Sequence, residues 1–181
     1  MKVRRYLKVL ICGLLVICIG VATPFVLLRR PYREWVESYS ETYGVDSLLV
    51  YAVMKAESDY DPKALSRSGA KGLMQIMNKT GSWGATECEI PNYSSDQLFD
   101  PEINIQIGCW YLAKLMNQYE GDQNLALAAY NAGSGNVAKW RANTLYSKDG
   151  RVLHTIPFKE TDKYVQKVSF YYTLYRLLYS H

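Results

Sequence analysis

One segment near the start of this chain restricts its fold more than any other: residues 9–28 contain no charged side chain and are dominated by Val, Ile and Leu. This is about the length that a helix needs to cross the hydrocarbon core of a bilayer. A cleaved signal peptide has a shorter apolar region followed by small residues, whereas this run continues past Val21-Ala22-Thr23-Pro24 to Leu28. We therefore expect residues 1–30 to be an uncleaved anchor, a single transmembrane helix.

The basic residues on either side of this anchor indicate its orientation only weakly. The charge of the rest of the chain argues against a nucleic-acid partner. The basic residues before the run barely outweigh those after it; they are Lys2, Arg4, Arg5 and Lys8 against Arg29, Arg30 and Arg33. The net charge of the whole chain is +4, but from residue 31 onward 15 basic residues face 17 acidic ones. A domain so close to neutral has no phosphate-binding stripe, so we expect no nucleic-acid partner.

The rest of the chain reads almost entirely as helices separated by Gly, Asn, Asp and Pro. Trp35 and Tyr43 belong to a helix expected to end at Gly44, and Asp46 or Ser47 can cap the next one. In that second helix the apolar residues Leu49, Ala52, Val53 and Ala56 recur at helical spacing. Glu57 follows Val53 by four positions, so it lies at the end of the inward-facing stripe.

Later segments predict further helices around an irregular stretch. Residues 64–101 are rich in Gly, Ser, Asn and Asp, with a short helix expected over 73–77 and at most a small β-hairpin. Apolar spacing predicts helices over 103–115, 125–130 and 164–178, with a loop over 143–157. The fold class is therefore mainly α, one domain over residues 31–181.

The cysteines and histidines give no metal signal. Cys88 and Cys109 could pair outside the cell or remain thiols, and the second alternative is slightly favoured. They do not have metal-ligand spacing, and neither do His154 and His181. We expect no metal and no cofactor.

Glu57 is the candidate for chemistry. A carboxyl group at the end of a buried stripe is partly desolvated, which raises its pKa and keeps it protonated near neutral pH. Such an acid can protonate a glycosidic oxygen as it leaves. The alternative is a helix-end glutamate paired with a lysine. The turn that follows argues against it, because Gly69 and Gly72 let backbone approach a ligand while Ser66 and Gln75 offer hydrogen bonds to sugars.

Three segments carry a family resemblance. They are Glu57-Ser58 with Gly69-Ala70-Lys71-Gly72-Leu73-Met74-Gln75-Ile76-Met77, then Ala128-Ala129-Tyr130-Asn131-Ala132-Gly133-Ser134-Gly135, then Ile156-Pro157-Phe158-Lys159-Glu160-Thr161-Asp162-Lys163-Tyr164-Val165. In this order they resemble the soluble-type lytic transglycosylases, bacterial enzymes with a goose-lysozyme-like fold. The resemblance covers roughly residues 33 to 180. Asn78 departs from it, since the family usually has a proline there.

The resemblance implies a reaction with one carboxyl group instead of the usual two. Glu57 would protonate the leaving oxygen of the MurNAc-β-1,4-GlcNAc bond of peptidoglycan and then accept the proton of the C6 hydroxyl, giving a 1,6-anhydro-MurNAc end. The 2-acetamido group would stabilise the cation-like intermediate. From sequence, Asp59 should point away from Glu57, and Asp61 before Pro62 suits a turn.

The resemblance also implies substrate-binding residues, each with a structural alternative. Tyr130 and Tyr164 would line the reacting subsite but could be core aromatics. Asn131 would bind substrate or cap its helix. Gln75 and Met77 would contact sugar or peptide along the cleft wall, and Ser66 would contribute a hydroxyl group.

Two other functions remain open at this stage. One is a hydrolytic muramidase of lysozyme type, which cleaves the same bond with water. The other is a wall-binding scaffold component of a secretion, conjugation or sporulation machine, which leaves room for unidentified protein partners in the cell envelope. Because peptidoglycan lies outside the cytoplasmic membrane, each alternative places the domain on the wall-facing side of a single-pass anchor.

Overall fold

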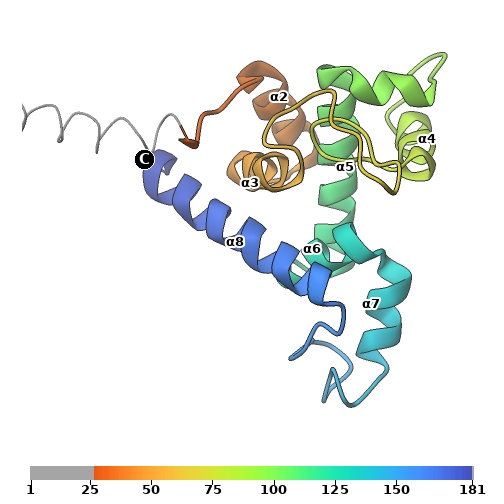
Figure 1. Ribbon diagram of the computed structural model, residues 1–181, viewed down its shortest axis with the longest axis vertical. Helices are drawn as coiled ribbons and strands as arrows, with labels where there is room; N and C mark the ends of the chain where they lie inside the picture. The colour runs from red at the N-terminus through yellow and green to blue at the C-terminus, as the bar shows by residue number, and fades with distance from the viewer. Residues whose placement is uncertain (1–26, 181) are drawn as a thin grey trace, which may run out of the picture. The chain divides into compact units, whose positions relative to one another are not determined.

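The computed structural model describes residues 27–180, and the chain divides into two units, Met1–Pro31 and Tyr32–His181. The second unit is mainly α, as predicted (Figure 1). Within the described residues its helices are α2 Arg33–Tyr43, α3 Ser47–Glu57, α4 Asn78–Glu87, the 3-10 helix η1 Ser95–Phe99, α5 Pro101–Gln118, α6 Gln123–Ala132, α7 Ser134–Arg141 and α8 Lys159–Tyr179.

Helix α3 places the candidate acid and has the expected ends. Gly44, with φ at 69°, ends α2 in the left-handed conformation that glycine adopts without strain. The side chain of Asp46 then caps α3 by accepting from the backbone N–H of Leu48 at 2.8 Å. Residues 49–54 of α3 are all buried, and Glu57 is its last residue. The glutamate therefore leaves the core where the helix ends.

The two longest helices of the described residues, α5 and α8, form the frame of the domain. Helix α5, green in Figure 1, packs against α2, α4 and α6, while α8, in blue, packs along α3 and α6. The side chains of Ile105, Ile107 and Leu112 on α5 are fully buried, and so are Ala126–Ala129 on α6. Buried apolar area on these faces stabilises the domain. Helix α7 was not expected; it begins directly after Gly133, where the sequence had predicted only a turn.

The segment between α3 and α4 differs from the prediction. Residues 73–77 form a turn instead of the expected short helix, with Gln75 at a φ of 49°. At most a small hairpin was expected in this segment, and it contains two isolated antiparallel bridges, Leu65–Lys71 and Lys71–Ile76. The predicted helix is absent because tertiary hydrogen bonds from α5 fix this backbone.

Those hydrogen bonds come from one buried side chain, Asn104 on α5. Its Oδ1 accepts from the N–H of Met74 at 2.8 Å, and its Nδ2 donates to the carbonyls of Lys71 at 2.9 Å and Leu98 at 2.7 Å. Gly72, at a φ of 74°, must lie against this amide, since an added Cβ would come within 2.4 Å of Nδ2. The side chain of Asn104 thus fixes the backbone of the turn that carries Gln75 and Met77.

The predicted anchor, residues 9–28, lies outside the described residues except for its last two. In the described part of the chain, none of the helices has both the length and the apolar character that crossing a membrane requires. Cys88 and Cys109 are free thiols, as favoured from sequence.

Candidate active site

Glu57 has the perturbed acidity expected of a catalytic acid. Its side chain is partly buried at the end of α3. Desolvation raises the pKa of its carboxyl group to about 7, while hydrogen bonding from Tyr164 and the charge of Lys167 act in the opposite direction. At neutral pH a substantial fraction of this group is therefore protonated.

Tyr164 is the hydroxyl neighbour of Glu57 on α8. The ring is buried, and the hydroxyl has no partner of ordinary hydrogen-bond length and angle among the described residues. Its contact with Glu57 is consequently looser than a standard hydrogen bond, yet close enough to lower the pKa of the carboxyl group. Burial and the Glu57 charge both raise the pKa of Tyr164, so it stays a neutral donor. Tyr164 is therefore both a buried aromatic and an electrostatic neighbour of Glu57.

Lys167, one helical turn beyond Tyr164, supplies the nearby positive charge. Its Nζ donates to the carbonyl of Ala56 at 2.6 Å, which ties α8 to the last turn of α3. This bond holds the ammonium group beside Glu57 without pairing it to the carboxylate. The sequence analysis did not single out Lys167, because its partner lies 111 positions away along the chain.

Tyr130 approaches Glu57 from the end of α6. Its hydroxyl donates to the carbonyl of Met74 at 2.8 Å, joining α6 to the turn that follows α3. Burial and then the charge of Glu57 raise the pKa of Tyr130 well above its usual value. The side chain is both a structural tie and a neighbour of the acid.

A pocket of about 250 Å³ lies between this turn and the end of α6. It brings together four of the predicted residues, Gln75, Met77, Tyr130 and Asn131. Its other lining residues are Ile76, Thr80, Tyr111, Ala132 and Gly133. Met77 is 44% exposed, so its thioether lies at the open side where a ligand could touch it. Tyr111, in the helix predicted over 103–115, was not predicted as a pocket residue.

The polar groups of the predicted residues are partly used by the fold. The Nε2 of Gln75 donates to the carbonyls of Ala64 and Gly72 at 3.2 and 2.9 Å. The Oδ1 of Asn131 accepts from Thr161 at 2.8 Å, which connects α6 to α8, while Gly133 is the C-cap of α6. These side chains keep other donors or acceptors for a ligand.

Ser66 lies outside the lining of this pocket. Its hydroxyl oxygen accepts from the N–H of Ala70 at 2.9 Å and closes the glycine-containing loop. The geometry therefore assigns it a loop-forming hydrogen bond, and substrate contact through its free hydroxyl proton stays a prediction.

The neighbouring carboxylates are occupied elsewhere. Asp59 forms an ion pair with Lys55, and Asp61 accepts from the N–H of Lys63 at 2.8 Å, as a turn residue does. Among the described residues, the groups that shift the pKa of Glu57 are a tyrosine and a lysine. A second carboxylate at catalytic distance would also act on that pKa, so the site has the electrostatics of a single acid.

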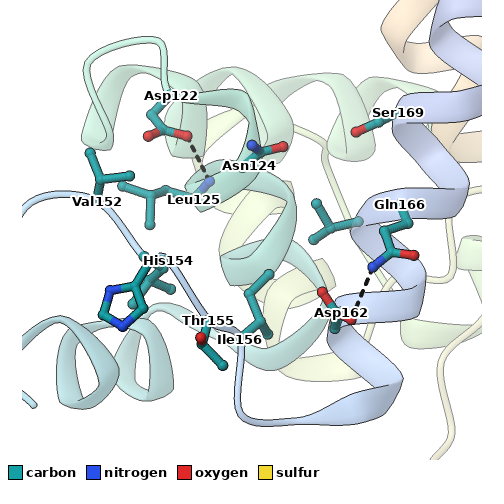
Figure 2. A pocket seen from close by; sticks show the side chains of 12 residues that line it. Asp122, Asn124, Leu125, Val152, His154, Thr155, Ile156, Asp162, Gln166 and Ser169 are labelled. Atoms are coloured by element: carbon teal, nitrogen blue, oxygen red, sulfur yellow. Dashed lines mark hydrogen bonds between the residues drawn. The ribbon is translucent and has the colours of Figure 1, made fainter. Parts of the chain in front are cut away.

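A larger cavity, of about 540 Å³, is a different feature (Figure 2). It lies between the start of α6, residues 152–156 and the first half of α8. Its two carboxylates hold the fold: Asp122 caps α6 through the N–H of Leu125 at 3.0 Å, and Asp162 accepts from Gln166 at 3.0 Å. Glu57 lines neither this cavity nor the smaller pocket, but Tyr130, whose pKa the charge of Glu57 raises, lines the smaller one.

Comparisons with known proteins agree with this geometry. Residues 34–152 match the protein family described as Transglycosylase SLT domain. The soluble lytic murein transglycosylase of Escherichia coli (strain K12) is 38% identical over 147 residues, which are 80% of this chain and 23% of that protein. The membrane-bound lytic murein transglycosylase C of Edwardsiella ictaluri (strain 93-146) is 42% identical over 124 residues, 60% of this chain and 33% of that protein.

A solved structure shows the same arrangement of helices. An inactive mutant of the lytic transglycosylase Slt from Pseudomonas aeruginosa superposes with a TM-score of 0.75 at 34% identity, covering 85% of this chain and 25% of that one. The class defined here is therefore a mainly α domain with the lysozyme-like fold of Slt. The chain belongs to the transglycosylase SLT domain family. It spans 23% to 33% of the length of the two relatives described above.

Proposed function

We propose that this chain is a peptidoglycan lytic transglycosylase in which Glu57 is the only catalytic carboxyl group. The observation that carries the proposal is the pKa of Glu57, raised to about 7 by desolvation at the end of α3, with Tyr164 beside it and Lys167 as the nearby charge. A group with this pKa can donate and accept a proton at the same pH. Both steps of the reaction need that property.

The proposed reaction balances without water. Protonated Glu57 gives its proton to the oxygen that joins C1 of MurNAc to C4 of GlcNAc, and the C1–O bond breaks. The C6 hydroxyl of the same MurNAc then attacks C1, forming a new C1–O bond, and its proton returns to Glu57. The products are a 1,6-anhydro-MurNAc end and a free GlcNAc hydroxyl. The 2-acetamido group would stabilise the positive charge that develops at C1.

The neighbours of Glu57 have distinct roles in this proposal. Tyr164 donates toward the carboxylate after proton transfer, and Lys167 adds a positive charge that prevents the pKa from rising further. Tyr130 closes the subsite while holding the turn through Met74. Gln75, Met77 and Asn131 would contact sugar or peptide in the pocket, and Ser66 would contribute from the adjoining loop.

Product analysis tests this function directly. Purified peptidoglycan digested with the chain should yield fragments with 1,6-anhydro ends, detected by mass spectrometry as a loss of one water relative to reducing ends. The Glu57→Gln variant should yield none. Reducing muramic acid ends from the wild type would establish a hydrolytic muramidase instead. Absence of any product, together with a cellular phenotype that persists in Glu57→Gln, would establish a scaffold.

We also propose that residues 9–28 anchor residues 31–181, the catalytic domain, to the outer face of the cytoplasmic membrane. The support is the uncharged length of the run and the position of peptidoglycan outside that membrane. A relative named as membrane-bound is compatible with this placement. In a Lys148→Cys variant, whose site is exposed, a membrane-impermeant thiol reagent should label intact cells above the background of the native cysteines. Labelling only after lysis would reverse the topology, and release into the medium would show a cleaved signal.

A further inference from the structure

A group of aromatic rings continues outward from the pocket. Tyr111 and Tyr130 both line the pocket, and their ring centroids are 5.3 Å apart. The ring of Trp83 lies 6.5 Å from that of Tyr111 and 4.8 Å from that of Trp110. Trp83 is on α4, three positions after Thr80, which also lines the pocket. The aromatic surface therefore runs from the wall of the pocket across α5 to α4.

Trp83 is exposed, and its position is nevertheless fixed. It is 43% exposed, whereas Trp110 beneath it is only 8% exposed. The two rings meet edge to face at an interplanar angle of 89°, and the Nε1 of Trp83 donates to Glu87 at 3.2 Å. Such an arrangement holds the indole in one orientation before any ligand arrives. Preorganisation of this kind reduces the entropic cost of binding.

The backbone of α4 next to Trp83, at Gly84, packs closely against α5. A Cβ added at Gly84 would lie 2.6 Å from Cγ2 of Ile107 and 3.2 Å from the ring of Trp110. Helix α4 consequently approaches α5 at this point as closely as a glycine allows. This close packing keeps the exposed indole at one place relative to Tyr111.

Packing alone does not account for an exposed indole at this site. An aromatic residue this exposed loses hydrophobic stabilisation that a buried position would give. A charged group, Lys114, lies over it, with its Nζ 4.8 Å from the Trp83 ring and 5.6 Å from the Trp110 ring. Lys114 is exposed, and a cation–π contact at an exposed site is weak, so a ligand can displace it from the rings at little cost.

We propose that Trp83, Trp110 and Tyr111 form a stacking platform that binds a sugar ring of the glycan strand beyond those held in the pocket. The apolar C–H face of a pyranose packs on an aromatic ring, and the hydroxyl groups around its edge stay in water. The apolar faces of these rings suit the sugar backbone better than the charged stem peptide. This inference rests on the proposed function, because the platform extends the same substrate site. Its consequence is a preference for longer glycan strands.

Binding of peptide-free glycans of two lengths tests the platform. The probes are a tetrasaccharide and an octasaccharide of alternating GlcNAc and MurNAc, titrated into the full chain carrying Glu57→Gln in detergent, followed by calorimetry. Adding Trp83→Ala should weaken octasaccharide binding about 3- to 10-fold, the range of one aromatic contact, and leave tetrasaccharide binding unchanged within about 2-fold. Trp83→Tyr should restore most of the loss. Phe170→Ala, at a more exposed aromatic on α8 (60% against 43% for Trp83), is the control and should change neither affinity.

Two results would overturn the platform. One is equal affinity of Trp83→Ala and its parent for the octasaccharide. The other is an equal loss for both glycans, which would make Trp83 a structural residue or part of the pocket. If Trp83→Ala does not fold, acrylamide quenching of tryptophan fluorescence decides instead: the octasaccharide, and not the tetrasaccharide, should protect the exposed indole. Failure of these tests would leave the 1,6-anhydro product assay unaffected, so the two proposals fail separately.

Discussion

Two polar side chains lie close to the same turn and are treated in opposite ways by the fold. Asn104 is fully buried, and its amide makes three hydrogen bonds of 2.7 to 2.9 Å to the backbone. Glu57 is partly buried, and among the described residues the only side-chain donor acting on its carboxyl group is Tyr164. The amide of Asn104 has hydrogen-bond partners for both its oxygen and its nitrogen. The carboxyl group of Glu57 has lost contact with water without gaining enough hydrogen bonds to offset that loss.

This difference separates a residue that stabilises the fold, Asn104, from one that we propose takes part in the reaction, Glu57. A satisfied buried amide adds stability and fixes one conformation of the turn. A carboxyl group that has lost water without gaining strong partners pays in stability and acquires a raised pKa. Perturbed groups of this kind occur at functional sites. Asn104 thus fixes the turn between α3 and α4 that carries Gln75 and Met77, two proposed substrate residues, and α3 presents Glu57, the proposed acid.

The largest expected effect is on catalysis. Glu57→Gln should keep the fold and lower turnover of peptidoglycan by about two to four orders of magnitude, or more if the same group is also the base. The amide has the shape of the acid but has no proton to transfer. Release of soluble anhydro fragments measures the loss. Asp59→Asn, which removes an exposed carboxylate paired with Lys55, is the control and should retain activity. Near-normal lysis by Glu57→Gln would reject the assignment.

Removing the side chain of Asn104 should lower the stability of the domain instead of acting directly on catalysis. Asn104→Ala leaves the N–H of Met74 and the carbonyls of Lys71 and Leu98 without a buried partner, so we expect a loss of about 3–5 kcal/mol in the free energy of unfolding. Urea denaturation of residues 31–181 measures it. Gln106→Ala on the same helix loses only a 3.5 Å contact to Tyr43 and should cost under about 1 kcal/mol. Equal losses would remove the distinction drawn for Asn104.

Two glycines in the segment between α3 and α4 test how closely its backbone must approach Asn104. Gly69 and Gly72 both have positive φ, at 86° and 74°, so alanine is strained at each by about 1 kcal/mol. Only at Gly72 would the new Cβ meet atoms, 2.2 Å from the carbonyl oxygen of Leu98 and 2.4 Å from Asn104. We expect Gly72→Ala to destabilise the domain by about 3 kcal/mol and Gly69→Ala by about 1. Similar values for both would mean that the contact with Asn104 relaxes easily.

Sequence reasoning found the acid but not its surroundings. Glu57 is identifiable because the apolar spacing of α3 and the cap at Asp46 are local, and the structure reproduces both. The turn over 73–77 was wrongly expected to be helical, because its conformation depends on Asn104, about thirty positions further along. Lys167 and Tyr111 were missed as site residues for the same reason. Their contacts with the site cross between helices, and periodicity reports only which face of a helix is apolar.

The smallest expected effect is a dependence of stability on pH. The pKa of Glu57 is raised from 4.5 to about 7, so the folded chain binds this proton more tightly than the unfolded chain. Its contribution is fully present below pH 4.5 and is lost as the pH rises through about 7. Glu57→Gln should therefore be more stable than the wild type at pH 8, by on the order of 1–3 kcal/mol, and show no such gain at pH 4. An unchanged difference at the two pH values would show that the carboxyl group is not desolvated.

Direct titration of Glu57 tests the central claim, which is that this carboxyl group is an acid poised near neutral pH. The side-chain carboxyl carbons of residues 31–181, labelled with ¹³C-glutamate, can be followed by NMR from pH 3 to 9, and the resonance absent from Glu57→Gln identifies Glu57. We predict a midpoint of about 7, rising further in Lys167→Met because a nearby positive charge is removed. A midpoint near 4.5, the ordinary value for a glutamate, would contradict the assignment of Glu57 as the general acid.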